Sequence, residues 1–182
     1  GATVKDEFIE LYNPNAVDVN LAGFALKKKT SGGTESNLVS AGAFSGTIKA
    51  LGYFLIAPPE ATSDLPYSGK TFSIASNNTV LLYNAAGALL DKVGFGTATD
   101  FETAAAVNPD ANKSIERKKL GQDTDDNSQD FKISDAPTPG GTFPKTTIQD
   151  VTNYADNPGI PYFTLSIKWA SPSVNINSYQ VQ

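Results

Sequence analysis

The sequence predicts an all-β protein built as a β-sandwich. Short runs alternate apolar and polar residues, which is the period of a half-buried strand. Gly, Pro, Asn and Ser interrupt these runs about every ten residues, as the turns of a sandwich require. The 182 residues suffice for one domain with its own apolar core and part of a second.

The strands of the first domain can be placed in order along the chain. The first is the stretch EFIELYN, and Val17, Val19 and Leu21 then alternate with Asp18 and Asn20. The alternation continues past Gly23 with Phe24 and Leu26. Since β-branched and aromatic residues between turn signals favour strands, further strands are expected at 38–39, 53–57, 71–74, 79–83 and 89–95.

Local sequence features add three further predictions to this strand pattern. TVLLY and ALLDKVGF, joined by Asn84-Ala85-Ala86-Gly87, predict a β-hairpin in which Gly87 takes a positive φ. The Ala-rich stretch 101–107 is expected to be a loop or a single turn, because Asn108-Pro109 ends any helix there. Lysines 27–29 indicate a solvated edge that discourages strand addition.

The chain is expected to divide into residues 1–135, a connector at 136–146 and a second unit at 147–182. The segment SDAPTPGGTFPKT is rich in Pro and Gly, without apolar periodicity, and suits an interdomain connector. Strand alternation resumes at 163–169 and 179–181. The sequence ends at Gln182 before a sheet is complete, so the second domain is expected to be partial.

Composition excludes several classes of site and partner. With no Cys and no His, the chain lacks disulfides, thiolate metal sites and the usual general base. A net charge of −5 with Arg117 as the one arginine argues against nucleic acid. No segment resembles a membrane span or an export signal. The absence of Met indicates a piece of a longer protein, and the Asn, Thr, Ser and Gly content is typical of secreted bacterial modules.

Residues 1–135 resemble the lamin tail domain, in its bacterial branch. The resemblance rests on EFIELYNP, VDVNLAGFAL, YFLIA, NNTVLLYNAAGALLDKVGFG, SIER and DTDDNSQDF, which occur in the family's order and spacing. It implies an immunoglobulin-like β-sandwich. The family has an earlier strand before EFIELYN, whereas only GATVKD precedes it here. The resemblance therefore implies a missing or short first strand and an open sheet edge.

Residues 147–182 are similar to the opening strands of a fibronectin type III domain. Trp169 stands in the position of the second strand and Tyr179 in that of the third. Since this covers less than half of that fold, Trp169 and Leu165 would face an incomplete core that a partner chain would cover.

One acidic run has the character of a metal site. Hard cations such as calcium bind carboxylate and amide oxygens that converge from one loop. The run departs from an EF-hand, since Ser128 stands for the central Gly and Ser134 for the final Glu. The alternative is a structural turn whose carboxylates accept backbone N–H bonds. The candidate calcium ligands are Asp123, Asp125, Asp126 and Asp130.

Other carboxylate and aromatic side chains are further candidates for a site. Glu10 and Glu116 are a carboxylate pair that could serve glycoside hydrolysis, but an ion pair with Arg117 is the favoured interpretation. Four aromatic residues could form a sugar-stacking face, although aromatics in alternating strands favour the core. They are Tyr53, Tyr67, Phe72 and Phe95. No catalytic residue and no cofactor other than calcium is predicted.

Together these features predict a non-catalytic structural or adhesive module of a larger bacterial surface or secreted protein, located outside the cell. Its partners would be other domains of the parent protein or neighbouring subunits. One alternative is an accessory module that binds cell-surface polysaccharide for a secreted hydrolase. Another is a subunit that self-assembles by strand complementation through its open edge or its partial second domain.

Overall fold

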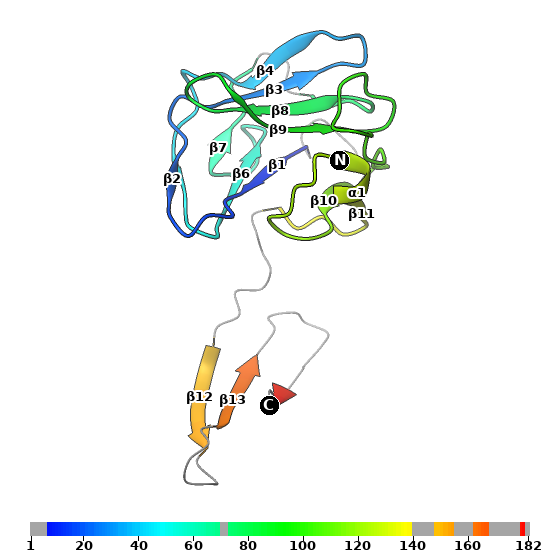
Figure 1. Cartoon of the computed structure of the whole chain (residues 1–182). Helices are drawn as coiled ribbons and strands as arrows, with labels where there is room; N and C mark the ends of the chain where they lie inside the picture. The colour runs from blue at the N-terminus through cyan, green and yellow to red at the C-terminus, as the bar shows by residue number, and fades with distance from the viewer. Residues whose placement is uncertain (1–6, 70–72, 140–147, 155–161, 168–178, 181–182) are drawn as a thin grey trace. The chain divides into compact units, whose positions relative to one another are not determined.

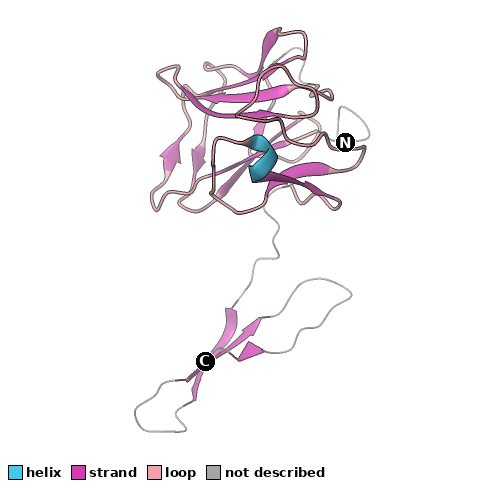
Figure 2. Cartoon of the chain, turned by 45° about the vertical axis from the view of Figure 1, so that its right-hand side comes forward, coloured by secondary structure: helices cyan, strands magenta, loops and turns pink. Residues whose placement is uncertain are grey.

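The computed structural model describes residues 7–69, 73–139, 148–154, 162–167 and 179–180 (Figure 1). The chain forms two compact units, Gly1–Gly141 and Thr142–Gln182. Strands dominate the described residues, and a single short helix lies beside one hairpin (Figure 2). The division predicted at 136–146 stays a prediction, and residues 140–146 of that connector lie outside the described ranges.

The first layer of unit 1 is a four-stranded antiparallel sheet in the order β4-β3-β8-β9, drawn at the top of Figure 1. β3 pairs with β8 along its whole length, and β8 forms a hairpin with β9. Gly87 in the hairpin turn has φ +79°, the left-handed conformation that glycine adopts without strain. The strands are β3 (Ala25–Lys29), β4 (Glu35–Val39), β8 (Thr79–Tyr83) and β9 (Leu89–Gly94).

The second layer combines three small sheets below the first (Figure 1). β1 pairs antiparallel with β6, and β7 adds in parallel to β6. The two-stranded sheets β2-β5 and β10-β11 complete the layer, with the single turn α1 before β11. The elements are β1 (Ile9–Tyr12), β2 (Val19–Asn20), β5 (Thr47–Ile48), β6 (Tyr53–Ala57), β7 (Leu65–Pro66), β10 (Ser114–Arg117), α1 (Asn127–Asp130) and β11 (Phe131–Ser134).

The core lies between the two layers. Residues directly opposite each other in a sheet share a face, and Ile9 faces Ile56 while Leu11 faces Phe54 across the β1–β6 pair. All four belong to the core or pack against it. Burial of these and neighbouring apolar side chains joins the sheets into one sandwich. Its buried members include Leu26, Leu38, Val39, Phe44, Phe54, Ile56 and Tyr67.

The strand predictions for this unit are confirmed at most places. Strands 53–57 and 79–83 match β6 and β8, and the third predicted strand, 89–95, becomes β9 with Phe95 in an isolated bridge to Ala106. The loop predicted at 101–107 is confirmed. The strand predicted at 71–74 is wrong for Ser73 and Ile74, because both are irregular, and its other residues lie outside the description.

The prediction of an exposed edge at lysines 27–29 is wrong. β3 is an interior strand with β4 on one side and β8 on the other. Lys28 points toward the core, is 6% exposed and donates from Nζ to the carbonyl oxygen of Ser73. Lys27 and Lys29 point outward and pair with Glu35 and Asp100. Each of the three lysine ammonium groups is therefore stabilised by a carbonyl or carboxylate partner, and the strand does not lie at an edge of the sheet.

Unit 2 contains a three-stranded antiparallel sheet in the order β12-β13-β14. Its strands are β12 (Ile148–Tyr154), β13 (Tyr162–Ile167) and β14 (Tyr179–Gln180). Strands near the predicted positions are therefore present. Trp169 lies outside the described residues, as does the segment 1–6 where the missing first strand was expected.

Candidate functional site

The four predicted calcium ligands lie in the turn before α1 and in α1 itself. Asp126 is the N-cap of α1, where its Oδ1 accepts hydrogen bonds from the backbone N–H of Ser128 (3.0 Å) and Gln129 (3.3 Å). Such a cap satisfies helix N–H groups that have no partner within the helix. Asp125 has φ +56° and donates its backbone N–H to Oδ1 of Asp123. The Oδ1 atoms of Asp123 and Asp126 thus accept backbone hydrogen bonds that shape the turn.

Asp130 is a buried carboxylate with a full set of partners. It is 5% exposed and accepts hydrogen bonds from the backbone N–H of Thr124 (2.8 Å) and from its Oγ1 (2.7 Å). Burial works against the charged form, but the bonds from Thr124 and the charge of Arg117 lower the pKa of Asp130 below its usual value. Asp130 is thus an ionised structural group.

Arg117, at the end of β10, connects this turn to the other layer. Its guanidinium lies 2.8 Å from Oδ2 of Asp91 on β9, 3.4 Å from Oδ1 of Asp123 and 3.3 Å from Oδ2 of Asp130. It also donates to the carbonyl of Gln122. Although burial opposes the charged form, the carboxylates of Asp91, Asp123 and Asp130 raise the pKa of Arg117.

The predicted ion pair between Arg117 and Glu116 is not formed. Neighbouring residues on a strand point to opposite faces, so Glu116 faces away from Arg117 and pairs with Lys132 of β11 at 3.0 Å. Glu10 lies on β1, in a different sheet of the same layer. The described contacts assign no shared chemistry to Glu10 and Glu116.

A carboxylate cluster forms around Asp123 that the sequence did not indicate. Among the described residues, Asp91, Glu102 and Asp123 each offer a carboxylate oxygen, and these oxygens lie within 4.8 Å of one another. Burial, followed by the charges of Asp91 and Asp123, raises the pKa of Glu102. Asp91 comes from a strand and Glu102 from a loop, so no spacing along the chain announces the cluster.

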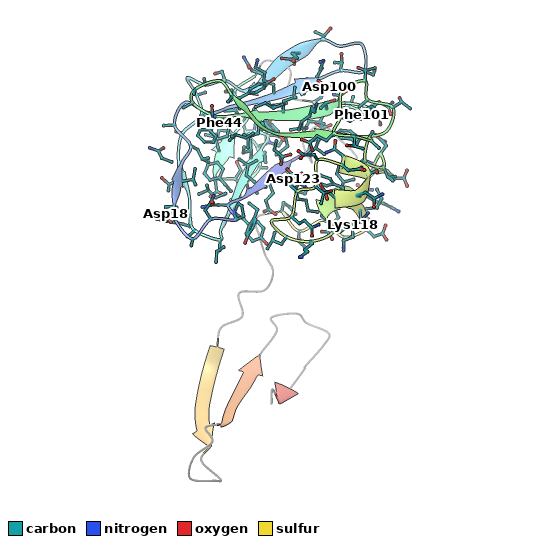
Figure 3. The ribbon with its side chains drawn as sticks, in the orientation of Figure 1. Asp18, Phe44, Asp100, Phe101, Lys118 and Asp123 are labelled. Atoms are coloured by element: carbon teal, nitrogen blue, oxygen red, sulfur yellow. The ribbon has the colours of Figure 1, made fainter. Side chains whose placement is uncertain are left out.

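Asn127 holds this region in place. Its side chain is 0% exposed, and Oδ1 accepts hydrogen bonds from the backbone N–H of Gly94 (2.8 Å) and Glu102 (3.2 Å). Its Nδ2 donates to the carbonyl of Lys92 (2.9 Å) and to Oε2 of Glu102 (2.8 Å). One amide therefore ties β9 and the loop around Glu102 to α1. Figure 3 labels Asp123 in this region, below Asp100 and Phe101 of that loop.

The arrangement can hold a hard cation in chemical terms, because three carboxylate oxygens of the kind calcium prefers lie close together. Arg117 already supplies a positive charge to Asp91 and Asp123. Of the four predicted ligands only Asp123 belongs to the cluster. The calcium site at Asp123, Asp125, Asp126 and Asp130 stays a prediction.

Two of the four aromatic candidates for a sugar-stacking face, Tyr67 and Phe95, lie in the interior. Tyr67 is 4% exposed and Phe95 7% exposed, so both are buried, and burial raises the pKa of Tyr67. Phe72 lies outside the described residues, and Tyr53 is half-buried on β6. The alternative that such residues belong to the interior is confirmed for Tyr67 and Phe95.

The β-sandwich agrees with a comparison to protein families, in which the model of the lamin tail domain matches residues 1–97. The chain belongs to the lamin tail domain family. No curated protein matches the chain. The matched part of this lamin tail domain runs from β1 to the end of β9 and includes Asp91, whereas Arg117, Asp123 and Asn127 follow it in sequence. Its immunoglobulin-like sandwich is a fold compatible with a non-catalytic structural role.

One further finding concerns membranes. Within the ranges that the structure describes, no helix has the length and apolar character needed to cross a bilayer.

Proposed function

We propose that this lamin tail domain is a non-catalytic structural and adhesive module of a larger bacterial surface or secreted protein. The proposal is supported by the hydrogen bonds and ion pairs that three polar side chains of the interior make between the layers. Asn127, Asp130 and Arg117 join the two layers and the turn before α1 to one another. A network of this kind stabilises one rigid arrangement, as a segment that bears load between other domains requires.

The inferred location outside the cell rests on composition. The chain is rich in Asn, Thr, Ser, Gly and Ala and has few charged residues, 18%, a composition typical of secreted bacterial modules. The fibronectin-like unit after the Pro-rich connector is part of the same proposal, because tandem β-domains form the stalks of extracellular proteins. The partners would then be neighbouring domains or subunits.

Fractionation of the native source tests the location, and an activity panel tests the absence of catalysis. Antibodies raised against the chain should detect the parent protein at the cell surface or in the medium, and detection in the cytosol alone would overturn the proposed location. The purified chain should leave glycoside, ester and phosphodiester substrates intact. Hydrolysis that Glu102→Gln abolishes would refute a non-catalytic role.

A further inference from the structure

Two loops of unit 1 are held together by a buried asparagine. They are the loop from 13 to 18, after β1, and the loop from 49 to 52, before β6. Asn13 is 3% exposed, and its Nδ2 donates to the carbonyl oxygens of Val17 (2.8 Å) and Lys49 (3.0 Å). A buried amide with this set of partners holds both loops in one arrangement. The loops therefore present their side chains to solvent from a rigid support.

Leu51 has an unusual conformation in the second of these loops. Its φ is +53°, in the left-handed region that favours glycine and disfavours leucine. Of the four other described non-glycine residues with positive φ, three are Asn or Asp, the types that tolerate it. The backbone N–H of Leu51 donates to the carbonyl oxygen of Asn15 (3.1 Å), and the residue is 61% exposed. Neither the turn nor the core thus requires a leucine here.

Two further aliphatic residues are exposed, one on the first loop and one on an adjoining loop. Val17 is 67% exposed and Leu120 is 54% exposed. Leu120 belongs to the loop from 118 to 122 after β10, which adjoins the first loop because a Cβ atom placed on Gly121 would lie 3.3 Å from Cβ of Pro14. Single exposed apolar residues are ordinary on a protein surface, whereas several on adjoining loops indicate a contact surface. The aliphatic tip is the set of Val17, Leu51 and Leu120.

The three loops are positively charged, although the protein is acidic. They contain three lysines and one aspartate, which gives a net charge of +2, whereas the chain has a net charge of −5. Lys118 and Lys119 directly precede Leu120, and no carboxylate among the described residues forms an ion pair with either lysine. Asp123, which follows the third loop, lies 3.4 Å from Arg117. The aliphatic tip is thus flanked by two ammonium groups that are available to an anion.

We propose that the aliphatic tip docks on a lipid surface with anionic headgroups, with Lys118 and Lys119 beside the headgroup phosphates. Aliphatic side chains gain free energy when they leave water for the acyl boundary, and this gain needs no shaped partner. Lysine suits the rim of such a contact, because its stem lies along apolar groups while its ammonium reaches the headgroups. A protein interface would centre on Trp, Tyr or Arg, which the tip lacks. The proposal goes beyond the structural role proposed above and does not rest on it.

Sedimentation of the full chain with vesicles of phosphatidylcholine and phosphatidylglycerol tests the proposal. The wild-type chain should bind these vesicles. Leu51→Gly removes the side chain and keeps the left-handed conformation without strain. It should weaken binding about tenfold, as the loss of a buried leucine side chain does, and leave the melting temperature little changed. Val107→Gly is the matched control, because Val107 is an aliphatic loop residue, 65% exposed, outside the three loops. It should leave binding unchanged.

Lys118→Gln combined with Lys119→Gln separates charge from apolar contact. The double variant should bind the anionic vesicles about tenfold more weakly at low salt and bind pure phosphatidylcholine vesicles as the wild-type chain does. Equal loss in Leu51→Gly and Val107→Gly, or no sedimentation of the wild-type chain with anionic vesicles, would overturn the proposal. Dimerisation that Leu51→Gly abolishes, without vesicle binding, would also overturn it and assign the aliphatic tip to contact between copies of the chain.

Discussion

Replacement of Asn127 by alanine should destabilise the lamin tail domain strongly, and more than the same replacement at an exposed asparagine. The side chain is 0% exposed, and its removal leaves the N–H groups of Gly94 and Glu102 and the carbonyl of Lys92 without their partner. A buried backbone group without a hydrogen bond costs about 1–3 kcal/mol. Water entering the space recovers part of this, so the free energy of unfolding should fall by about 3–5 kcal/mol.

Urea denaturation followed by circular dichroism measures this loss. With an m-value of about 2 kcal/mol/M, the midpoint should fall by roughly 2 M. Asn84→Ala is the matched control, because Asn84 also accepts two backbone N–H bonds, but in the exposed turn before Gly87. That variant should lose less than about 1 kcal/mol. A similar loss in both variants would refute the argument from burial.

Asn127→Asp adds a second test at the same position. The new carboxylate would face the carbonyl of Lys92 and Oε2 of Glu102, where the amide now donates. Its pKa in the folded protein should therefore rise. A raised pKa means that the protonated form is favoured on folding, so the penalty should shrink as the pH falls through that pKa. A penalty independent of pH would contradict this account.

Three further predictions concern the same region. Because burial, then Asp91 and Asp123, raise the pKa of Glu102 above 4.5, its ionisation costs stability, and the cost grows as pH rises through the folded pKa. Glu102→Gln should thus raise the thermal midpoint at neutral pH and leave it unchanged below about pH 4. Arg117→Met leaves the buried Asp130 without its cation and should cost about 3 kcal/mol in urea denaturation; a neutral effect would contradict a structural role. The predicted calcium site implies that Ca²⁺ raises the melting temperature and that Asp123→Asn removes the rise, whereas a midpoint that Ca²⁺ does not move would contradict it.

The sequence could predict the strands of the sandwich because strand and turn signals are local. The alternation in 53–57 and 79–83, and the turn glycine Gly87, depend on neighbours within a few residues, and the structure has them where they were expected. The same local reasoning predicted a sheet edge at lysines 27–29, and that prediction is wrong because β3 is an interior strand. Whether a strand lies at an edge depends on which distant strands pair with it.

The acidic site shows the same limit more clearly. The run from Asp123 to Asp130 was visible in the sequence, yet its members serve as a helix cap, a buried ion pair and part of a cluster. The other cluster members, Asp91 and Glu102, carry no local signal. Their oxygens meet because β9, a loop and the turn before α1 converge, and Asn127, the first residue of α1, bonds to β9 and to the loop.

By itself, the sequence determined the fold class, the hairpin around Gly87 and the absence of Cys and His chemistry, since these depend on composition and on short-range patterns. Tertiary structure alone decided that Lys28 is buried, that Arg117 pairs with Asp91 and that Tyr12 meets Tyr53. Arg117 and Asp91, like Tyr12 and Tyr53, lie on different strands, and Lys28 bonds to a residue 45 positions away. Such residues are brought together by strand pairing and by the packing of one layer on another. Both depend on segments far apart in the sequence, so the pattern within a single strand does not predict them.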